Sequence, residues 1–216
     1  GADHPHTLME AYGALGGVGL ERGDLQTAVR VFERAVDVLR VRGFGDANTL
    51  SSLGYAYALS GRPSEALPLL EEATRGEASI SAMGLGQAVR ISRLAEGCLL
   101  AGRASEALTL ARSAIDLSRQ HKERANEAIG LRVLAEVMAR SDTLDANGAA
   151  EQYVRSLAIA EALGPYIGLI ITSCILMGRL EEFSMKNNVL HSMLDAFASG
   201  IAFGYTLLVL SVVREF

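Results

Sequence analysis

A pattern of small and large residues that recurs four times along the chain constrains its fold more than any other feature. In the clearest copy, Leu53-Gly54 is followed at short intervals by Gly61 and then by Ala66. One alanine begins the second half of each copy: Ala28, Ala66, Ala107 and Ala149. Small residues at fixed positions let helix axes approach closely, while large apolar side chains fill the grooves between them. The pattern therefore predicts pairs of antiparallel helices stacked in a row.

The best-formed copy resembles the tetratricopeptide repeat. It runs from Leu50 to Tyr57 and continues with Gly61, Ala66, Leu70 and Ala73. The resemblance implies an all-α fold: a right-handed superhelix of four to five antiparallel helix pairs plus an atypical apolar C-terminal helix. The copies are spaced 38, 41 and 42 residues apart, longer than the standard repeat of about 34. We expect four repeats in residues 1–165, and a degenerate fifth repeat with a capping or oligomerisation helix in residues 166–216.

Capping and turn residues place the helix boundaries. Asp24 and Asp46 can each cap a helix, and Pro63 suits a first helical turn. Gly164-Pro165 should end the second helix of the fourth pair. The expected helices span residues 6–22, 24–42, 47–60, 63–76, 80–101, 104–121, 124–140, 147–163, 166–181, 185–198 and 201–214.

A second, narrower resemblance rests on the fourth copy. Its residues Ala125-Asn126-Glu127-Ala128 and the later stretch Leu157 to Gly164 are similar to the C-terminal repeat region of bacterial signalling proteins. Those proteins carry a nucleotide-cyclase-like domain and an AAA-type ATPase ahead of the repeats. This resemblance implies a sensor or scaffold role and supplies no catalytic residue.

The residue inventory argues against catalysis and against several classes of ligand. A net charge of -5 with no basic run makes direct nucleic-acid binding unfavourable. The four histidines are scattered, and the two cysteines, Cys98 and Cys174, match apolar packing positions. We therefore expect no enzyme, no catalytic residue, no metal site and no cofactor, in a cytoplasmic protein.

The repeat resemblance also implies a binding surface. In such arrays the first helix of each pair lines a concave face, and particular positions point into the groove. A peptide held there would bond to asparagine and serine, stack on tyrosine and pair with arginine. The expected peptide-binding residues are Glu10, Asn48, Ser51, Tyr55, Ser92, Arg93, Glu96, Arg132, Glu136 and Arg140. The alternative is a solvated helix face with internal salt bridges.

These features favour a protein-binding scaffold, the regulatory arm of a larger signalling protein, with a protein or peptide partner. Two alternatives come from the C-terminal stretch 196–213, which holds 18 residues without a charge. One is a self-associating structural module, and the other is a membrane-tethered adaptor, although Gly200, Gly204 and the absence of a basic flank make a membrane unlikely. A helix that is apolar all round needs a partner. We expect a homodimer through Tyr205, Leu208, Val209 and Val212.

Overall fold

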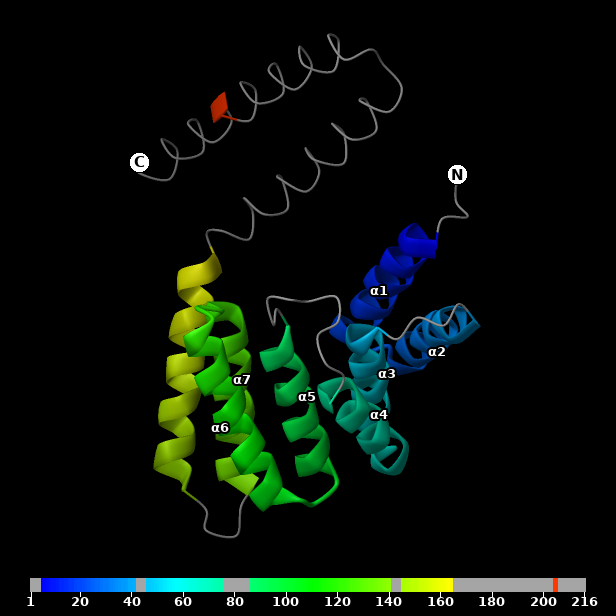
Figure 1. The fold of residues 1–216 in the computed structure, drawn as a ribbon. Helices are drawn as coiled ribbons and strands as arrows, with labels where there is room; N and C mark the ends of the chain where they lie inside the picture. The colour runs from blue at the N-terminus through cyan, green and yellow to red at the C-terminus, as the bar shows by residue number, and fades with distance from the viewer. Residues whose placement is uncertain (1–4, 42–45, 76–85, 141–144, 165–203, 206–216) are drawn as a thin grey trace. The chain divides into compact units, whose positions relative to one another are not determined.

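The computed structural model shows a helical chain (Figure 1). It describes residues 5–41, 46–75, 86–140, 145–164 and 204–205. Within these ranges every regular element is an α-helix and no strand occurs, so the all-α prediction is confirmed.

The helices follow the sequence prediction closely. Seven of them are α1 (Pro5–Glu21), α2 (Leu25–Val41), α3 (Ala47–Leu59), α4 (Pro63–Arg75), α5 (Gln87–Leu100), α6 (Ala104–Gln120) and α7 (Arg124–Arg140). A further helix, which we call helix 146–164, follows α7 and is drawn in yellow in Figure 1.

Local capping explains why these helices begin where they do. The carboxylate of Asp46 accepts hydrogen bonds from the backbone N–H groups of Asn48 (3.2 Å) and Thr49 (3.0 Å) at the start of α3. The Oδ1 atom of Asp24 accepts one from the N–H of Thr27 (3.1 Å) in α2. Both side chains satisfy backbone donors that the first helical turn leaves unpaired, as the sequence predicted.

One predicted boundary was wrong. The helix expected over residues 80–101 begins at Gln87, and residues 76–85 lie outside the described part of the chain. Gly86, directly before Gln87, has φ +81°, in the left-handed region. A residue in that conformation cannot continue a right-handed helix. The predicted helix began too early because the prediction followed the helical spacing of residues before Gly86 and missed the stop at this glycine.

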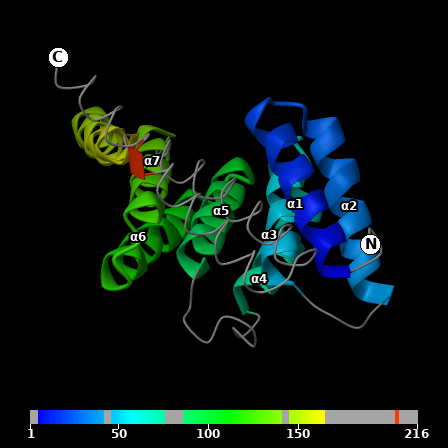
Figure 2. The same cartoon turned by 90° about the horizontal axis from the view of Figure 1, so that it is seen from above.

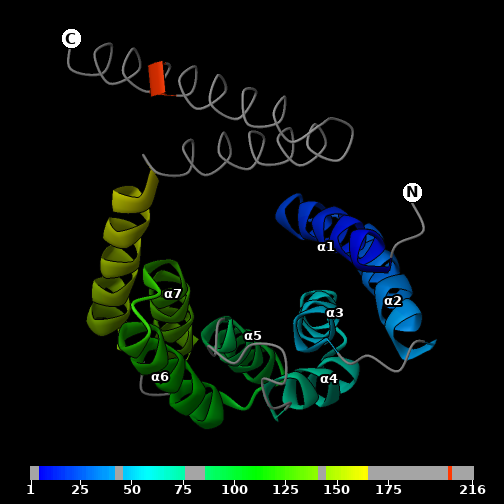
Figure 3. The same cartoon turned by 45° about the horizontal axis from the view of Figure 1, so that its top comes forward.

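The helices pack as successive antiparallel pairs. The helices of each of three pairs contact each other: α1 with α2, α3 with α4, and α5 with α6. Figure 2 shows α1 and α2 side by side. Each second helix also contacts the first helix of the next pair: α2 touches α3, α4 touches α5, and α6 touches α7. Consecutive first helices are in contact as well. Helices α1, α3, α5 and α7 thus form one layer of the array, and α2, α4 and α6 form the other (Figure 3).

Glycines make the close approaches within pairs possible. A Cβ atom built on Gly54 of α3 would lie 2.8 Å from Cγ of Leu70 in α4, and one on Gly16 of α1 would lie 2.5 Å from Cζ of Phe32 in α2. Neither position has room for a methyl group. The sequence pattern had assigned Gly54 to such a helix contact.

The chain divides into two compact units, residues 1–160 and 161–216. Of the second unit the structure describes residues 161–164 and 204–205. The helices predicted over 166–181, 185–198 and 201–214, and the repeat and cap expected there, therefore lie outside the described residues. None of the helices in the described part of the chain has both the length and the hydropathy needed to cross a membrane.

Candidate functional site

The predicted concave-face residues fall on the layer formed by the first helices. Glu10 lies in α1, and the remaining nine are distributed three each over α3, α5 and α7. Direct contacts join α3 to α5 and α5 to α7 through these side chains. We call the joined set the inner-face network: Asn48, Ser51, Ser52, Tyr55, Arg90, Arg93, Glu96, Arg132 and Glu136.

Glu96 of α5 is the centre of this network. Its Oε2 atom accepts a hydrogen bond from the Tyr55 hydroxyl of α3 at 3.1 Å and pairs with Arg132 Nη2 of α7 at 2.8 Å. Arg132 also donates through Nη1 to Glu136 Oε1 at 2.9 Å. Glu96 is buried, so a single carboxylate links three helices from three consecutive pairs in a place that solvent screens weakly.

The network shifts the proton affinities of its members. Burial, reinforced by the negative charge of Glu96, raises the pKa of Tyr55 to about 12. Burial acts to lower the pKa of Arg132, but its hydrogen bond and charge pairing with Glu96 outweigh that effect and raise it. Tyr55 is therefore a neutral hydrogen-bond donor and Arg132 a permanent cation at physiological pH. Neither is poised for general acid or base catalysis.

Arg93 of α5 is held at the other end of the network. Its guanidinium lies 5.5 Å from the centre of the Tyr55 ring and donates to the hydroxyl of Ser52 at 3.0 Å and of Ser51 at 3.5 Å. Burial lowers the pKa of Arg93. Its cation is stabilised by an aromatic face and hydroxyl groups.

Sequence reasoning missed Arg90, one turn before Arg93. Arg90 is buried, and its Nη1 atom donates to Oδ1 of Asn48 at 3.0 Å. Its spacing of three residues from Arg93 puts both on one helix face, which was the available signal. Ser51 and Ser92 are also completely buried, and in the described part of the chain the Ser92 hydroxyl has no hydrogen-bond partner.

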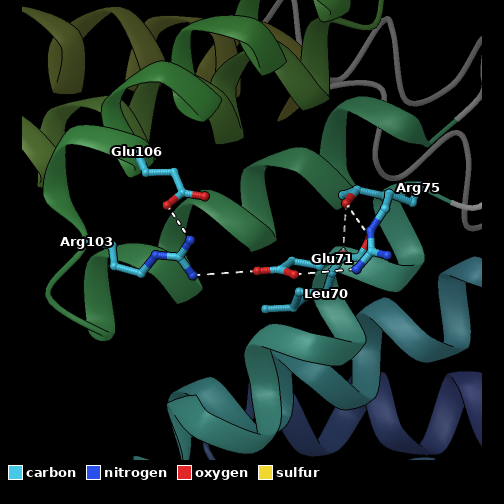
Figure 4. Close-up of polar contacts among 6 residues, drawn as sticks. Leu70, Glu71, Arg75, Arg103 and Glu106 are labelled. Atoms are coloured by element: carbon cyan, nitrogen blue, oxygen red, sulfur yellow. Dashed lines mark hydrogen bonds and ion pairs between the residues drawn. The ribbon is translucent and has the colours of Figure 1, made fainter.

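The opposite layer has its own ion-pair chain, shown in Figure 4. Glu71 of α4 lies 3.6 Å from Arg103, at the start of α6, and 3.5 Å from Arg75, while Arg103 also pairs with Glu106. All four side chains are substantially solvated, so the chain of ion pairs contributes little to stability. These ion pairs connect the second helices α4 and α6, whose backbones are not in contact with each other.

Neither a reactive thiolate nor a cluster of metal ligands is found among the described residues. Cys98 is fully buried, and burial, followed by the charge of Glu106, raises the pKa of its thiol to about 11. Such a thiol carries almost no thiolate at neutral pH. In the part of the chain that the structure describes, no three His, Cys, Asp or Glu side chains gather closely enough to hold a metal ion. Cys174 lies outside that part.

The predicted dimer residues are mostly beyond the described ranges. Tyr205 is exposed, and Leu208, Val209 and Val212 lie outside the described residues. The arrangement in the first unit is thus a set of side-chain contacts that joins α3, α5 and α7, which belong to three successive helix pairs.

Two family models match different parts of the chain. A family model described as a tetratricopeptide repeat matches residues 2–76, which supports the repeat resemblance seen in the sequence. A second family model, described as an Rnf-Nqr subunit and membrane protein, matches residues 149–216. The second match begins inside helix 146–164. The comparisons lend no support to the narrower resemblance with cyclase and ATPase signalling proteins.

Curated relatives have names that correspond to the second family model. The chain is 42% identical over 67 residues to a subunit of the Na(+)-translocating NADH-quinone reductase of Psychromonas ingrahamii, covering 30% of this chain and 32% of the relative. It is 46% identical over 57 residues to the corresponding reductase subunit of Neisseria gonorrhoeae, covering 26% and 27%. It is 44% identical over 57 residues to a subunit of the ion-translocating oxidoreductase complex of Glaesserella parasuis, covering 26% and 25%. The chain therefore spans about a quarter to a third of the length of these relatives.

These matches overturn much of the function predicted from the sequence. The sequence predicted a cytoplasmic, non-enzymatic scaffold in signalling and argued against a membrane. These predictions were wrong. The relatives are named as subunits of oxidoreductase complexes, and their family model is described as a membrane protein. The error has a physical cause: an uncharged helical stretch can be the buried cap of a repeat array or a segment within lipid, and periodicity alone does not separate the two.

Proposed function

We propose that this chain is a component of a membrane-bound, ion-translocating oxidoreductase complex of the Nqr or Rnf type. Two observations carry the proposal: residues 149–216 match the Rnf-Nqr family model, and the chain is 42 to 46% identical over 57 to 67 residues to subunits of such complexes. The composition of that segment supports it, because residues 196–213 include no charged side chain. A stretch of this length is at the lower limit for spanning a bilayer.

The structure supports separate roles for two parts of the chain. Helix 146–164 packs on α7, where the Ser156 hydroxyl donates to the backbone carbonyl of Ala128 at 2.8 Å. The same helix contains the start of the oxidoreductase-subunit match. We infer that residues 5–140 form a helical-repeat extension, and that helix 146–164 joins it to a segment integrated in the complex.

We also infer that the extension is a right-handed tetratricopeptide-type superhelix. Three observations support the repeat type: the recurring small residues, the two-layer pairing of helices, and the repeat-family match over residues 2–76. The right-handed sense is what the resemblance to this repeat implies. The ten residues predicted to bind a peptide remain a prediction. Seven of them hold one another or their neighbours through side-chain contacts: Asn48, Ser51, Tyr55, Arg93, Glu96, Arg132 and Glu136. These contacts reduce the donors and acceptors that the seven side chains can offer to another chain.

Membrane fractionation of the full chain tests the main proposal. In bacteria that make an Nqr complex, the tagged chain should stay in membranes after alkaline washing and migrate with NADH-quinone reductase activity on a native gel. The double variant L208K/V212K puts two charges into the matched segment, and charges there are costly in lipid. It should lose both properties.

The control variant carries the same two added charges elsewhere. Gln26→Lys with Thr109→Lys changes two exposed positions of the repeat extension and should behave as the parent chain does. Release of the parent chain by alkaline washing, together with migration apart from the reductase activity, would contradict the proposal.

A further inference from the structure

The contact between α3 and α5 holds two guanidinium groups on neighbouring turns. Arg90 donates from Nη1 to Oδ1 of Asn48 at 3.0 Å. Arg93 donates from Nη1 to the hydroxyl of Ser52 at 3.0 Å. Asn48 and Ser52 are one turn apart on α3, and residues with that spacing lie on the same face of a helix. We call these four residues the polar strip.

Both cations of the polar strip are withdrawn from solvent. Arg90 is 4% exposed, and Arg93 is partly buried. Burial lowers the pKa of each guanidinium. Two like charges one helical turn apart also repel each other. Burying a charge is costly unless an opposite charge compensates it, so the strip favours a negative charge close by.

No carboxylate in the described part of the chain supplies that charge at close range. None of the ion pairs found there includes Arg90 or Arg93. Asp46 acts on Arg90 from a distance, but its carboxylate accepts hydrogen bonds at the start of α3. Glu96 acts on Arg93 in the same way and is already the centre of the inner-face network.

The polar strip also keeps hydrogen-bond donors that the described residues do not use. The buried Nε atom of Arg90 has no partner among them. Arg93 uses Nη1 for its hydrogen bonds to hydroxyl groups and leaves Nη2 without a described acceptor. Asn48 is exposed and offers Oδ1 to Arg90, so its amide N–H groups remain available as well. A ligand with negative charge and several acceptor oxygens matches these donors.

We propose that the polar strip binds a phosphate group between α3 and α5. A phosphate monoester carries about 1.5 to 2 negative charges at pH 7, which matches two guanidinium groups, whereas a carboxylate carries one. Arginine suits this ligand because its planar fork of N–H groups can reach two phosphate oxygens at once. The proposal rests on the α3–α5 contact and does not depend on the match to oxidoreductase subunits.

Thermal unfolding of the full chain in a non-ionic detergent gives the first test. Replacing chloride by inorganic phosphate at equal ionic strength should raise the melting temperature, because a ligand of the folded chain stabilises it. Micelles that contain phosphatidic acid present the same group on a lipid. A rise with inorganic phosphate supports a free phosphate as ligand, and a rise with the lipid alone supports a head group. No rise with either probe would overturn the proposal, and an equal rise with acetate would overturn the choice of phosphate.

Variants of Arg93 separate the site from the general stabilisation that phosphate gives to folded proteins. Arg93→Gln removes one cation and should lose the part of the rise that belongs to the site. Arg93→Lys keeps the charge without the planar fork and should retain a fraction of it. The matched control is Arg112→Gln, which removes the same charge from an exposed position of α6 and should respond as the parent chain does. An equal rise in Arg93→Gln and the parent would overturn the proposal.

Phosphorus NMR gives a readout that does not depend on stability. Titrating inorganic phosphate, or the phosphatidic acid micelles, with the full chain below its melting temperature measures the dissociation constant directly. The constant should be at least about tenfold larger for Arg93→Gln than for the parent chain and unchanged for Arg112→Gln. The same constant for Arg93→Gln and the parent would mean that phosphate binds elsewhere, which contradicts the assignment to the polar strip.

Discussion

The contact between α3 and α4 can be tested by adding a single methyl group. In Gly54→Ala the new Cβ atom would lie 2.8 Å from Cγ of Leu70, 3.1 Å from the carbonyl oxygen of Ala66 and 3.2 Å from Cβ of Leu69. The carbonyl belongs to the helix backbone, and Leu70 is completely buried. Neither neighbour can retreat without moving α4, so the helices have to separate.

Two opposing effects set the magnitude. Replacing glycine by alanine within a helix stabilises by about 1 kcal/mol. Overpacking of a tight core costs about 1–3 kcal/mol, and the backbone contact with Ala66 puts Gly54 at the upper end. We expect a net loss of about 2 kcal/mol, which lowers the melting temperature by about 4–8 °C for a chain of this size.

The control is Gly13→Ala in α1, where the added methyl group would meet nothing within 4 Å. There the helix-propensity term acts alone, so the melting temperature should rise by about 2–4 °C. Thermal unfolding of both variants and the parent, followed by circular dichroism at the helical band, measures the two shifts. Shifts of the same sign would refute the argument, because α3 and α4 would then be farther apart than the structure gives.

Changes to single side chains test three other features. Glu96→Gln should destabilise the chain by about 2 kcal/mol in urea unfolding, because it removes one of the two carboxylates that pair with the partly buried guanidinium of Arg132. The control Glu72→Gln, on an exposed face, should change nothing measurable. Lys122 has φ +59°, so Lys122→Gly should stabilise by about 0.5–1 kcal/mol; a loss of stability would show that the lysine side chain compensates its strain. Hydrogen bonds from the side chain and then the backbone of Thr27 lower the pKa of Asp24. The stabilising effect of Asp24 should therefore be complete above the ordinary carboxyl pKa and vanish as the pH falls through the lowered pKa. Asp24→Asn should remove this pH dependence of the melting temperature between about pH 5 and 2, and an unchanged melting profile would contradict the argument.

The match to oxidoreductase subunits was not recoverable from residue patterns in this chain. The stretch from Leu157 to Gly164 continues the spacing of the earlier copies, so the pattern extends the repeats into the segment that the membrane family matches. Apolar spacing records which side of a helix avoids water. It does not record whether lipid, another helix or a second chain covers that side.

The sequence by itself determined the helices and their closest contacts. Caps such as Asp46 and glycines such as Gly54 act on neighbours within a few residues or across one short turn, so their effects can be read from spacing. Tertiary structure alone decided which equivalent positions are covered. Leu15 and Leu53 occupy the same position of the repeat, yet one is exposed and the other buried, because burial depends on whether a second helix lies beside it. For the same reason only the fold revealed that Glu96 is shared by three helices: its partners lie 41 and 36 residues away along the chain and meet it only when successive pairs are stacked.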